Sequence, residues 1–292
     1  MYLTGFADEA ASDIDGQIRA TKELGWEFIE ARKINDRNIH DISDDEFDIV
    51  CTKLENSGVK INCFGSTIAN WGKQITEPFD SSLEEAERAI PRMKRLGTKL
   101  IRIMSFAILK DRGPDDQMEQ ERFKRLRKLF GMFEAEGLVP VHENCMNYGG
   151  MGWNYTQKLV ENVPGLKLVF DTGNPVFTDD MAKPGPYRKQ SSWEFYTMVR
   201  DHIAYVHIKD GLFDEKSGET RFTWPGEGNG DVRRIIKDLL ANGYDGGFSI
   251  EPHLKVVAHD DSVSATAQAK YDSYVEYGRR IETIIKEIQA EL

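Results

Sequence analysis

The sequence has few cysteines and no long hydrophobic run. Its three cysteines, Cys51, Cys63 and Cys145, are widely spaced, so they form neither a disulfide framework nor a CxxC metal clip. No segment has the apolar length of a membrane-spanning helix, and the first residues, MYLTGFADEA, lack the charged and apolar regions of a signal peptide. We therefore expect a cytoplasmic protein that has no membrane partner.

Clustered positive charge is also missing. The chain has 38 Lys and Arg against 49 Asp and Glu, and its formal net charge is -11. Binding a nucleic-acid backbone requires clustered Lys and Arg, so we expect no nucleic-acid partner. With 292 residues, 40% of them hydrophobic, the chain suits a single α/β barrel with a large core.

One pattern recurs along the chain: an amphipathic helix, a glycine and then a short apolar strand. Glycine at a helix end favours a left-handed cap, and Ser43 to Glu46 and Ser81 to Glu84 have the spacing of capping boxes. Helices are expected at residues 18–25, 47–58, 84–97, 122–137, 155–165, 194–202, 232–246 and 274–292. Strands are expected at residues 2–9, 26–32, 59–66, 98–106, 138–144, 166–174, 203–210 and 247–253.

Short apolar strands separated by helices are typical of a parallel sheet that is covered on both faces. An open doubly wound sheet is one arrangement of such units, but eight of them match a closed barrel better. The sequence therefore predicts a single (β/α)8 TIM barrel domain over residues 1–292. Longer loops are expected after the third, sixth, seventh and eighth strands.

Four consecutive strands end on ionisable residues: Glu143, Asp171, His207 and Glu251. Side chains alternate along a strand, so each of these residues shares a face with the apolar residue two positions earlier. If that face is the barrel interior, all four groups meet at the carboxyl-end mouth, where barrel enzymes keep their active sites. Three crowded carboxylates repel one another unless a cation lies among them. The set suits Mn²⁺ or Mg²⁺, with Zn²⁺ or Co²⁺ as alternatives. The structural alternative is that each residue caps or anchors a loop.

The motifs HEN, FDTGN, VHIKD, PGEG and GFSIEPH occur in this order. The set resembles the xylose-isomerase-like barrel family of sugar phosphate isomerases and epimerases, which also includes the endonuclease IV type of nuclease. The resemblance implies one divalent ion held by Glu143, Asp171, His207 and Glu251. It also implies that Glu143 and Glu251 act as an acid–base pair on opposite faces of the substrate carbon.

The sequence departs from two branches of that family. The additional metal-binding histidines of the nucleases are missing, because the sixth strand continues as Asp171-Thr172-Gly173-Asn174 and the loop RFTWPGEGNG has no Asp or His. Free-sugar 3-epimerases tend to carry a His at the place of Asn174, and many have a Glu where this chain has Tyr148-Gly149-Gly150. The resemblance therefore leaves the substrate open.

Five more residues are candidates for substrate binding: Lys209, Asn174, His253, Glu9 and Trp71. Each has a structural alternative. Lys209 suits a salt bridge, Glu9 suits a cap on the helix that begins near Asp13, and Trp71 suits a loop anchor. His142 is out of phase with Glu143, so we expect it to point toward the helices as a packing residue.

These observations predict a metal-dependent isomerase or epimerase that acts on a sugar, keto-sugar or cyclitol. Removing a proton beside a carbonyl is easier when a metal stabilises the negative charge that develops. The first alternative is a lyase at the same site, which dehydrates a keto-cyclitol or cleaves a 3-keto glycoside. A non-catalytic sugar-binding barrel and an abasic-site nuclease are further alternatives. The family resemblance also suggests a homo-oligomer.

Overall fold

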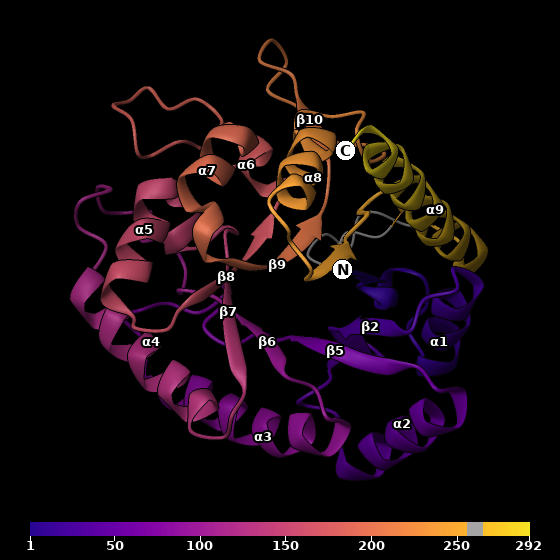
Figure 1. The fold of residues 1–292 in the computed structure, drawn as a ribbon. Helices are drawn as coiled ribbons and strands as arrows, with labels where there is room; N and C mark the ends of the chain where they lie inside the picture. Colours follow the sequence, from indigo (N-terminus) through magenta and orange to yellow (C-terminus); the bar gives the residue numbers. More distant parts are fainter. Residues whose placement is uncertain (256–264) are drawn as a thin grey trace.

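The chain folds into a nearly closed barrel of eight parallel strands surrounded by helices, as the sequence predicted (Figure 1). The computed structural model describes residues 1–255 and 265–292. The barrel strands are β1 (Tyr2–Gly5), β2 (Phe28–Ala31), β5 (Lys60–Gly65), β6 (Leu100–Ile103), β7 (Val139–Glu143), β8 (Lys167–Asp171), β9 (Ile203–Ile208) and β12 (Gly247–Ile250). They pair in the order β1-β12-β9-β8-β7-β6-β5-β2, and a parallel bridge between Phe6 and Glu30 joins the two edges.

The helices that cover the barrel match the predicted ones closely. They are α1 (Ile14–Glu23), α2 (Asp44–Ser57), α3 (Asp80–Leu96), α4 (Glu119–Glu134), α5 (Trp153–Asn162), α7 (Ser192–Val199), α8 (Val232–Ala241) and α9 (Ala267–Glu291). A short helix, α6 (Asn174–Phe177), and three 3-10 turns, η1 (Ala7–Glu9), η2 (Tyr148–Met151) and η3 (Arg200–His202), lie in the connections. Within the described residues, no helix is both long enough and apolar enough to cross a bilayer.

The helix caps confirm one of the two predicted capping boxes. The Ser43 side chain accepts a hydrogen bond from the Glu46 backbone, and Glu46 bonds back to Ser43. The other prediction was wrong, since α3 begins at Asp80 and its N-cap, Phe79, makes no side-chain cap. Ser81 therefore lies inside the first turn, where its hydroxyl cannot act as the cap.

Two loop features differ from the sequence prediction. Residues 104–118, after β6, form a long connection that was not expected. Two small hairpins, β3 (Lys33–Ile34) with β4 (Arg37–Asn38) and β10 (Gly211–Phe213) with β11 (Thr220–Phe222), lie in the loops after β2 and β9. The predicted long loop after the eighth strand includes residues 256–264, which lie outside the described residues.

The interior of the barrel changes from apolar to charged along the strands. Cys63, Val141, Val169 and Tyr205 form a small buried cluster inside the barrel. The strands β7, β8 and β9 continue from Val141, Val169 and Tyr205. Two residues later, on the same face of each strand, come Glu143, Asp171 and His207. As predicted from the alternation of side chains along a strand, these three charged side chains point into the barrel at the carboxyl ends of their strands.

His142 points the other way and packs between β7 and α5, as expected. It is fully buried, and its Nε2 lies 3.0 Å from the Ser105 hydroxyl. Burial lowers the pKa of His142 to about 4, so the ring is neutral near pH 7. Gly149 packs directly on this ring, because a Cβ at this position would lie 2.3 Å from His142 Cε1 and 2.9 Å from Leu159 Cδ1.

We predict that Gly149→Ala lowers the free energy of unfolding by about 1–3 kcal/mol, because an added methyl overpacks a full core site. Gly131→Ala in α4 is the matched control. A Cβ there meets nothing within 4 Å, and helix propensity favours alanine by up to about 1 kcal/mol. Urea unfolding of both variants measures the difference. Equal effects of the two substitutions would contradict the packing around His142.

Candidate metal centre

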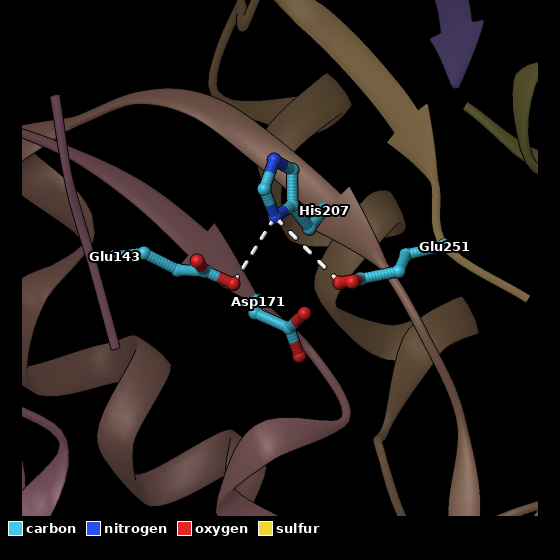
Figure 2. A group of neighbouring side chains, drawn as sticks. All are labelled: Glu143, Asp171, His207 and Glu251. Atoms are coloured by element: carbon cyan, nitrogen blue, oxygen red, sulfur yellow. Dashed lines mark hydrogen bonds and ion pairs between the residues drawn. The ribbon is translucent and has the colours of Figure 1, made fainter. Parts of the chain in front are cut away.

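The structure brings Glu143, Asp171, His207 and Glu251 together at the carboxyl end of the barrel (Figure 2). One donor atom from each residue lies within 4.8 Å of the others, and all four side chains are buried. Glu143 and Asp171 end β7 and β8, His207 lies near the end of β9, and Glu251 directly follows β12. Neighbouring parallel strands therefore deliver the four groups to one place.

The His207 ring connects this quartet to another carboxylate behind it. Its Nδ1 lies 3.3 Å from Glu143 Oε1 and 4.0 Å from Glu251 Oε2. Its Nε2 lies 3.2 and 3.1 Å from the two oxygens of Glu30. A proton on Nε2 toward Glu30 leaves the Nδ1 lone pair facing the quartet, which is the tautomer that a metal ligand needs.

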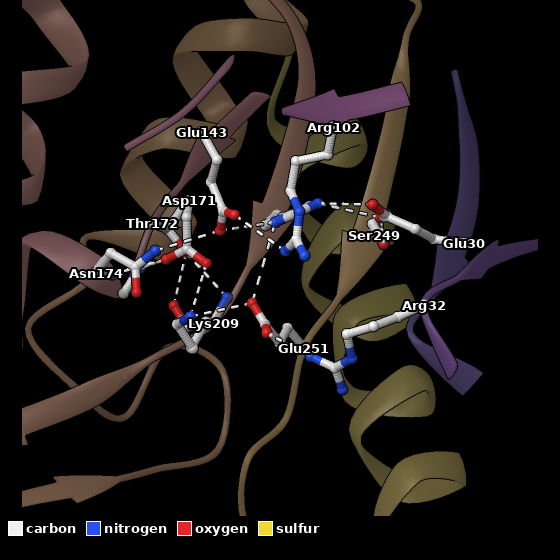
Figure 3. Close-up of polar contacts among 12 residues, drawn as sticks. Glu30, Arg32, Arg102, Glu143, Asp171, Thr172, Asn174, Lys209, Ser249 and Glu251 are labelled. Carbon is white, nitrogen blue, oxygen red and sulfur yellow. Dashed lines mark hydrogen bonds and ion pairs between the residues drawn. The ribbon is translucent and has the colours of Figure 1, made fainter. Parts of the chain in front are cut away.

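The sequence interpretation missed Glu30, which lies in the apolar strand β2. Its side chain is fully buried and accepts hydrogen bonds from Tyr205 Oη at 2.9 Å and Ser249 Oγ at 2.6 Å (Figure 3). The only signal in the sequence is an acidic residue between Ile29 and Ala31. Glu30 lies inside its strand, so a search for ionisable residues at strand ends does not find it.

The negative field of these carboxylates dominates the ring. Burial by itself lowers the pKa of His207, but Glu30 and Glu143 outweigh it and raise the pKa to about 10. The same field attracts any other cation that fits the space between the carboxylates.

Three buried cations, Arg32, Arg102 and Lys209, lie beside the quartet (Figure 3). Arg102, on β6, donates from Nη1 to Glu143 Oε2 at 3.0 Å. Lys209 Nζ lies 3.0 Å from Glu251 Oε2 and 2.9 Å from Asp171 Oδ2. Burial raises the pKa of Glu143, but Arg102 and His207 outweigh it and hold it at about 2. Lys209 was a candidate from the sequence, whereas Arg102 was missed inside the strand TKLIRIMSF.

Asp171 is the least compensated ligand. Its Oδ1 accepts hydrogen bonds from the backbone N–H groups of Gly173 at 2.8 Å and Asn174 at 2.7 Å. Its Oδ2 is buried and lies 2.9 Å from Lys209 Nζ in an ion pair that lacks regular hydrogen-bond geometry. Burial raises the pKa of Asp171 to about 6 against the opposing charge of Lys209. Three buried carboxylates and one imidazole, whose donor atoms lie within 4.8 Å of one another, fit a divalent cation.

The remaining candidate residues surround the quartet. Asn174 Nδ2 lies 3.3 Å from Glu143 Oε1. His253 bridges two carboxylates, with Nδ1 2.8 Å from Glu9 Oε1 and Nε2 3.3 Å from Glu251 Oε1. Glu9 does not cap α1, since Asp13 accepts the hydrogen bond from Gly16.

A cavity of about 460 Å³ opens above these groups. Its lining includes Arg32, Arg102, Glu143, Asn174, Lys209 and Glu251. Trp71 lies in its wall and is 39% exposed. The size falls within the roughly 300–1,000 Å³ of pockets that bind small molecules.

A second histidine–carboxylate cluster, His40 with Asp41 and Glu85, has a structural explanation. Lys73 Nζ lies 2.5 Å from Glu85 Oε2, and Arg88 Nη2 lies 2.6 Å from Asp41 Oδ1. Both carboxylates therefore already have a cationic partner. The cluster joins the loop after β4 to α3, so we interpret it as a tertiary contact.

The fold and the buried quartet define a (β/α)8 barrel with a metal-type site at its mouth. Residues 18–271 match the family model of the xylose isomerase-like TIM barrel, and the chain belongs to this family. No curated protein matches the sequence.

Solved structures with the same fold extend over nearly the whole chain. A D-tagatose 3-epimerase-like protein has a TM-score of 0.72 at 15% identity, covering 100% of this chain and 99% of its own. A xylose isomerase-like TIM barrel protein from Mycobacterium smegmatis, in complex with magnesium, has a TM-score of 0.69 at 17% identity and coverages of 98% and 97%. The 3-keto-D-glucoside 4-epimerase from E. coli has a TM-score of 0.62 at 17% identity and coverages of 96% and 99%. At these identities the likeness shows the fold.

We predict that Glu30→Gln weakens Mn²⁺ binding by about 10–100-fold, because carboxylates behind a histidine ligand commonly contribute that much affinity. Tyr205→Phe is the control, since it removes a different partner of Glu30 and leaves the contact with His207. Isothermal titration calorimetry with Mn²⁺ gives both affinities. An affinity of Glu30→Gln within twofold of wild type would show that Glu30 does not orient the ring.

The His40 cluster predicts a pH-dependent stability. Burial lowers the pKa of His40, but the carboxylates of Asp41 and Glu85, 3.3 and 3.9 Å from its Nε2, outweigh burial and raise the pKa above its usual value. Because the folded-state pKa lies above the unfolded one, the stabilisation is complete below the unfolded pKa and is lost as pH rises through the folded pKa. Wild type should therefore exceed His40→Gln in stability most at pH 5.5 and least at pH 9.

Urea unfolding at several pH values between these limits measures that difference. His202→Gln, at a partly exposed histidine in η3, is the control and should keep a constant, small difference from wild type. A stability gap for His40→Gln that widens as pH rises would contradict the assignment.

Proposed function

We propose that the protein is a divalent-metal-dependent isomerase or epimerase that acts on a sugar, keto-sugar or cyclitol, with Mn²⁺ as the preferred ion. The observation that carries this proposal is the buried quartet of three carboxylates and one imidazole beside a cavity of about 460 Å³. Residues Glu143, Asp171, His207 and Glu251 would hold the ion. Such an ion would polarise the substrate carbonyl and stabilise the negative charge that develops on its oxygen.

Glu143 and Glu251 are the proposed acid–base pair. β8 and β9 separate their strands in the sheet order, and their side chains approach the quartet from opposite sides (Figure 2). Each carboxylate is held by fixed donors, Glu143 by Arg102 and Glu251 by Lys209 and Arg32. This arrangement lets one carboxylate remove a proton from one face of a carbon while the other returns it to the opposite face.

The other mouth residues would bind the substrate. Lys209 and Asn174 each offer N–H donors beside a ligand carboxylate, so we assign them to substrate oxygens. We propose that His253 and Glu9, which bond each other, bind a hydroxyl together, and that Trp71 stacks on the C–H face of the sugar.

The cellular setting belongs to the same proposal. All three cysteines are free and buried, which supports a reducing cytoplasm. A homo-oligomer is also proposed, and light scattering on the purified protein tests it.

The first test is the metal content. We predict about one divalent ion per chain by plasma mass spectrometry, and loss of that ion in a His207→Ala/Asp171→Ala double variant. Two or three zinc ions per chain would instead favour the nuclease. If no metal binds after reloading, the proposed function is wrong.

The second test is proton exchange in D₂O with a panel of keto-sugars and cyclitols. We predict deuterium incorporation beside the carbonyl, with a rate that falls by at least about 100-fold in Glu251→Gln because a general base is lost. Metal content of the variant, measured in parallel, separates loss of the base from loss of the ion. Exchange accompanied by release of water or an aglycone would identify the lyase instead, and unchanged exchange in Glu251→Gln would exclude the proposed base.

A further inference from the structure

A second cavity of about 610 Å³ lies beside the one above the quartet. It is formed by the loops after four consecutive strands, β5, β6, β7 and β8. Trp71 and Met146 line both cavities, so the two spaces adjoin at these side chains. Trp71 is 39% and Met146 is 41% exposed, so apolar surface lies open where the two cavities adjoin.

More of the residues that line the second cavity are apolar than of those that line the first. Its inner surface includes the apolar side chains Ile108, Leu109, Met151, Phe177 and Met181. Charged residues contribute too, but Asp179 and Lys189 pair with each other at 2.8 Å. An apolar group placed here would be buried against these side chains, which is favourable.

The methionines add a preference for flat, polarizable groups. Met146, Met151 and Met181 all line the cavity. Their flexible thioethers adapt to irregular shapes and make favourable contacts with aromatic rings. Trp71 offers a further aromatic surface at the boundary with the first cavity.

We propose that the second cavity binds an apolar, preferably aromatic, substituent attached to the substrate. This inference rests on the proposed function, because the polar, carbonyl-bearing part of the substrate would lie in the first cavity. The substrate class is therefore a conjugate, such as an aryl glycoside of an oxidised sugar, and not a free monosaccharide. A free monosaccharide would fill the charged cavity alone and leave the apolar wall in water.

A second copy of this chain is the competing occupant of that wall. The continuity of the two cavities through Trp71 and Met146 favours a substrate group, because whatever fills the second cavity lies directly beside the first. Charged residues around the second cavity, including Lys110 and Asp111, also suit a solvent-facing entrance.

Binding of two unreactive probes tests the inference. Titration calorimetry on the metal-loaded protein compares 4-nitrophenyl β-D-glucopyranoside with methyl β-D-glucopyranoside. We expect the aryl probe to bind at least about tenfold more tightly, as burial of an aromatic ring predicts. Met146→Asn and Met181→Asn should each remove most of this preference.

Met198→Asn is the matched control for Met146→Asn. Met198 lies on α7 and is also 41% exposed, but it lines neither cavity. It should leave the aryl preference unchanged. A preference below twofold in wild type, or one that survives in both cavity variants, overturns the inference. The inference is also overturned if Met146→Glu dissociates an oligomer of the protein and the wild type shows no aryl binding.

The outcome is separable from that of the proposed function. The corresponding 3-oxo glucosides, aryl and methyl, are compared for proton exchange in D₂O. Equal exchange with both would keep the proposed function and overturn the inference. No exchange with either, together with aryl binding that Met181→Asn removes, would support the second cavity and overturn the proposed chemistry.

Discussion

Compensation of buried negative charge is the constraint on which the rest of the mouth depends. Glu30, Glu143, Asp171 and Glu251 are all buried within one group of contacts. An ionised carboxylate taken out of water costs several kcal/mol unless partners replace the lost solvation. Strands and loops far apart in the sequence therefore supply cations to one point: Arg32, Arg102, His207 and Lys209.

This constraint also explains the apolar residues nearest the site. The Phe6 ring lies 4.3 Å from the Arg32 guanidinium carbon and 5.2 Å from that of Arg102, and its ring centre is 5.0 Å from that of His207. The electron-rich face of an aromatic ring stabilises cations without adding another charge. Phe6 therefore adds a cation–π contact to both arginines, which also bond to the carboxylates Glu251 and Glu143. The quartet is therefore surrounded by packed side chains as well as carried by the barrel strands.

Strand alternation was enough to predict the barrel and the meeting of four strand-end residues, because both follow from local pattern. It could not identify Glu30 or Arg102, since a charged residue within a strand is most often solvent-facing. Arg102 reaches Glu143 across the neighbouring strands β6 and β7, whereas Glu30 reaches His207 only when the barrel closes and brings β2 toward β9. Glu9 shows the same limit: its sequence position suggested a helix cap, but its partners Arg32 and His253 come from other strand ends. Contacts between residues far apart in the sequence produce no local pattern from which they could be predicted.

The departure from the family pattern and the second cavity have a common structural basis. The resemblance associates many free-sugar 3-epimerases with a glutamate a few residues past the ligand on β7, where this chain has Tyr148, Gly149 and Gly150. None of the three can present a carboxylate as the backbone stands. Tyr148 turns away and donates to Glu119 at 2.6 Å, Gly149 packs on His142, and a Cβ at Gly150 would lie 1.6 Å from the Cys145 oxygen.

Gly150 instead contributes to the wall of the second cavity. The segment that holds a polar clamp in those relatives is therefore used here to shape an apolar space. A substitution at Gly150 could not restore the clamp, because the turn leaves no room for a Cβ there. The backbone after β7 thus supports the proposed conjugate substrate, and this support is independent of the acid–base roles proposed for Glu143 and Glu251.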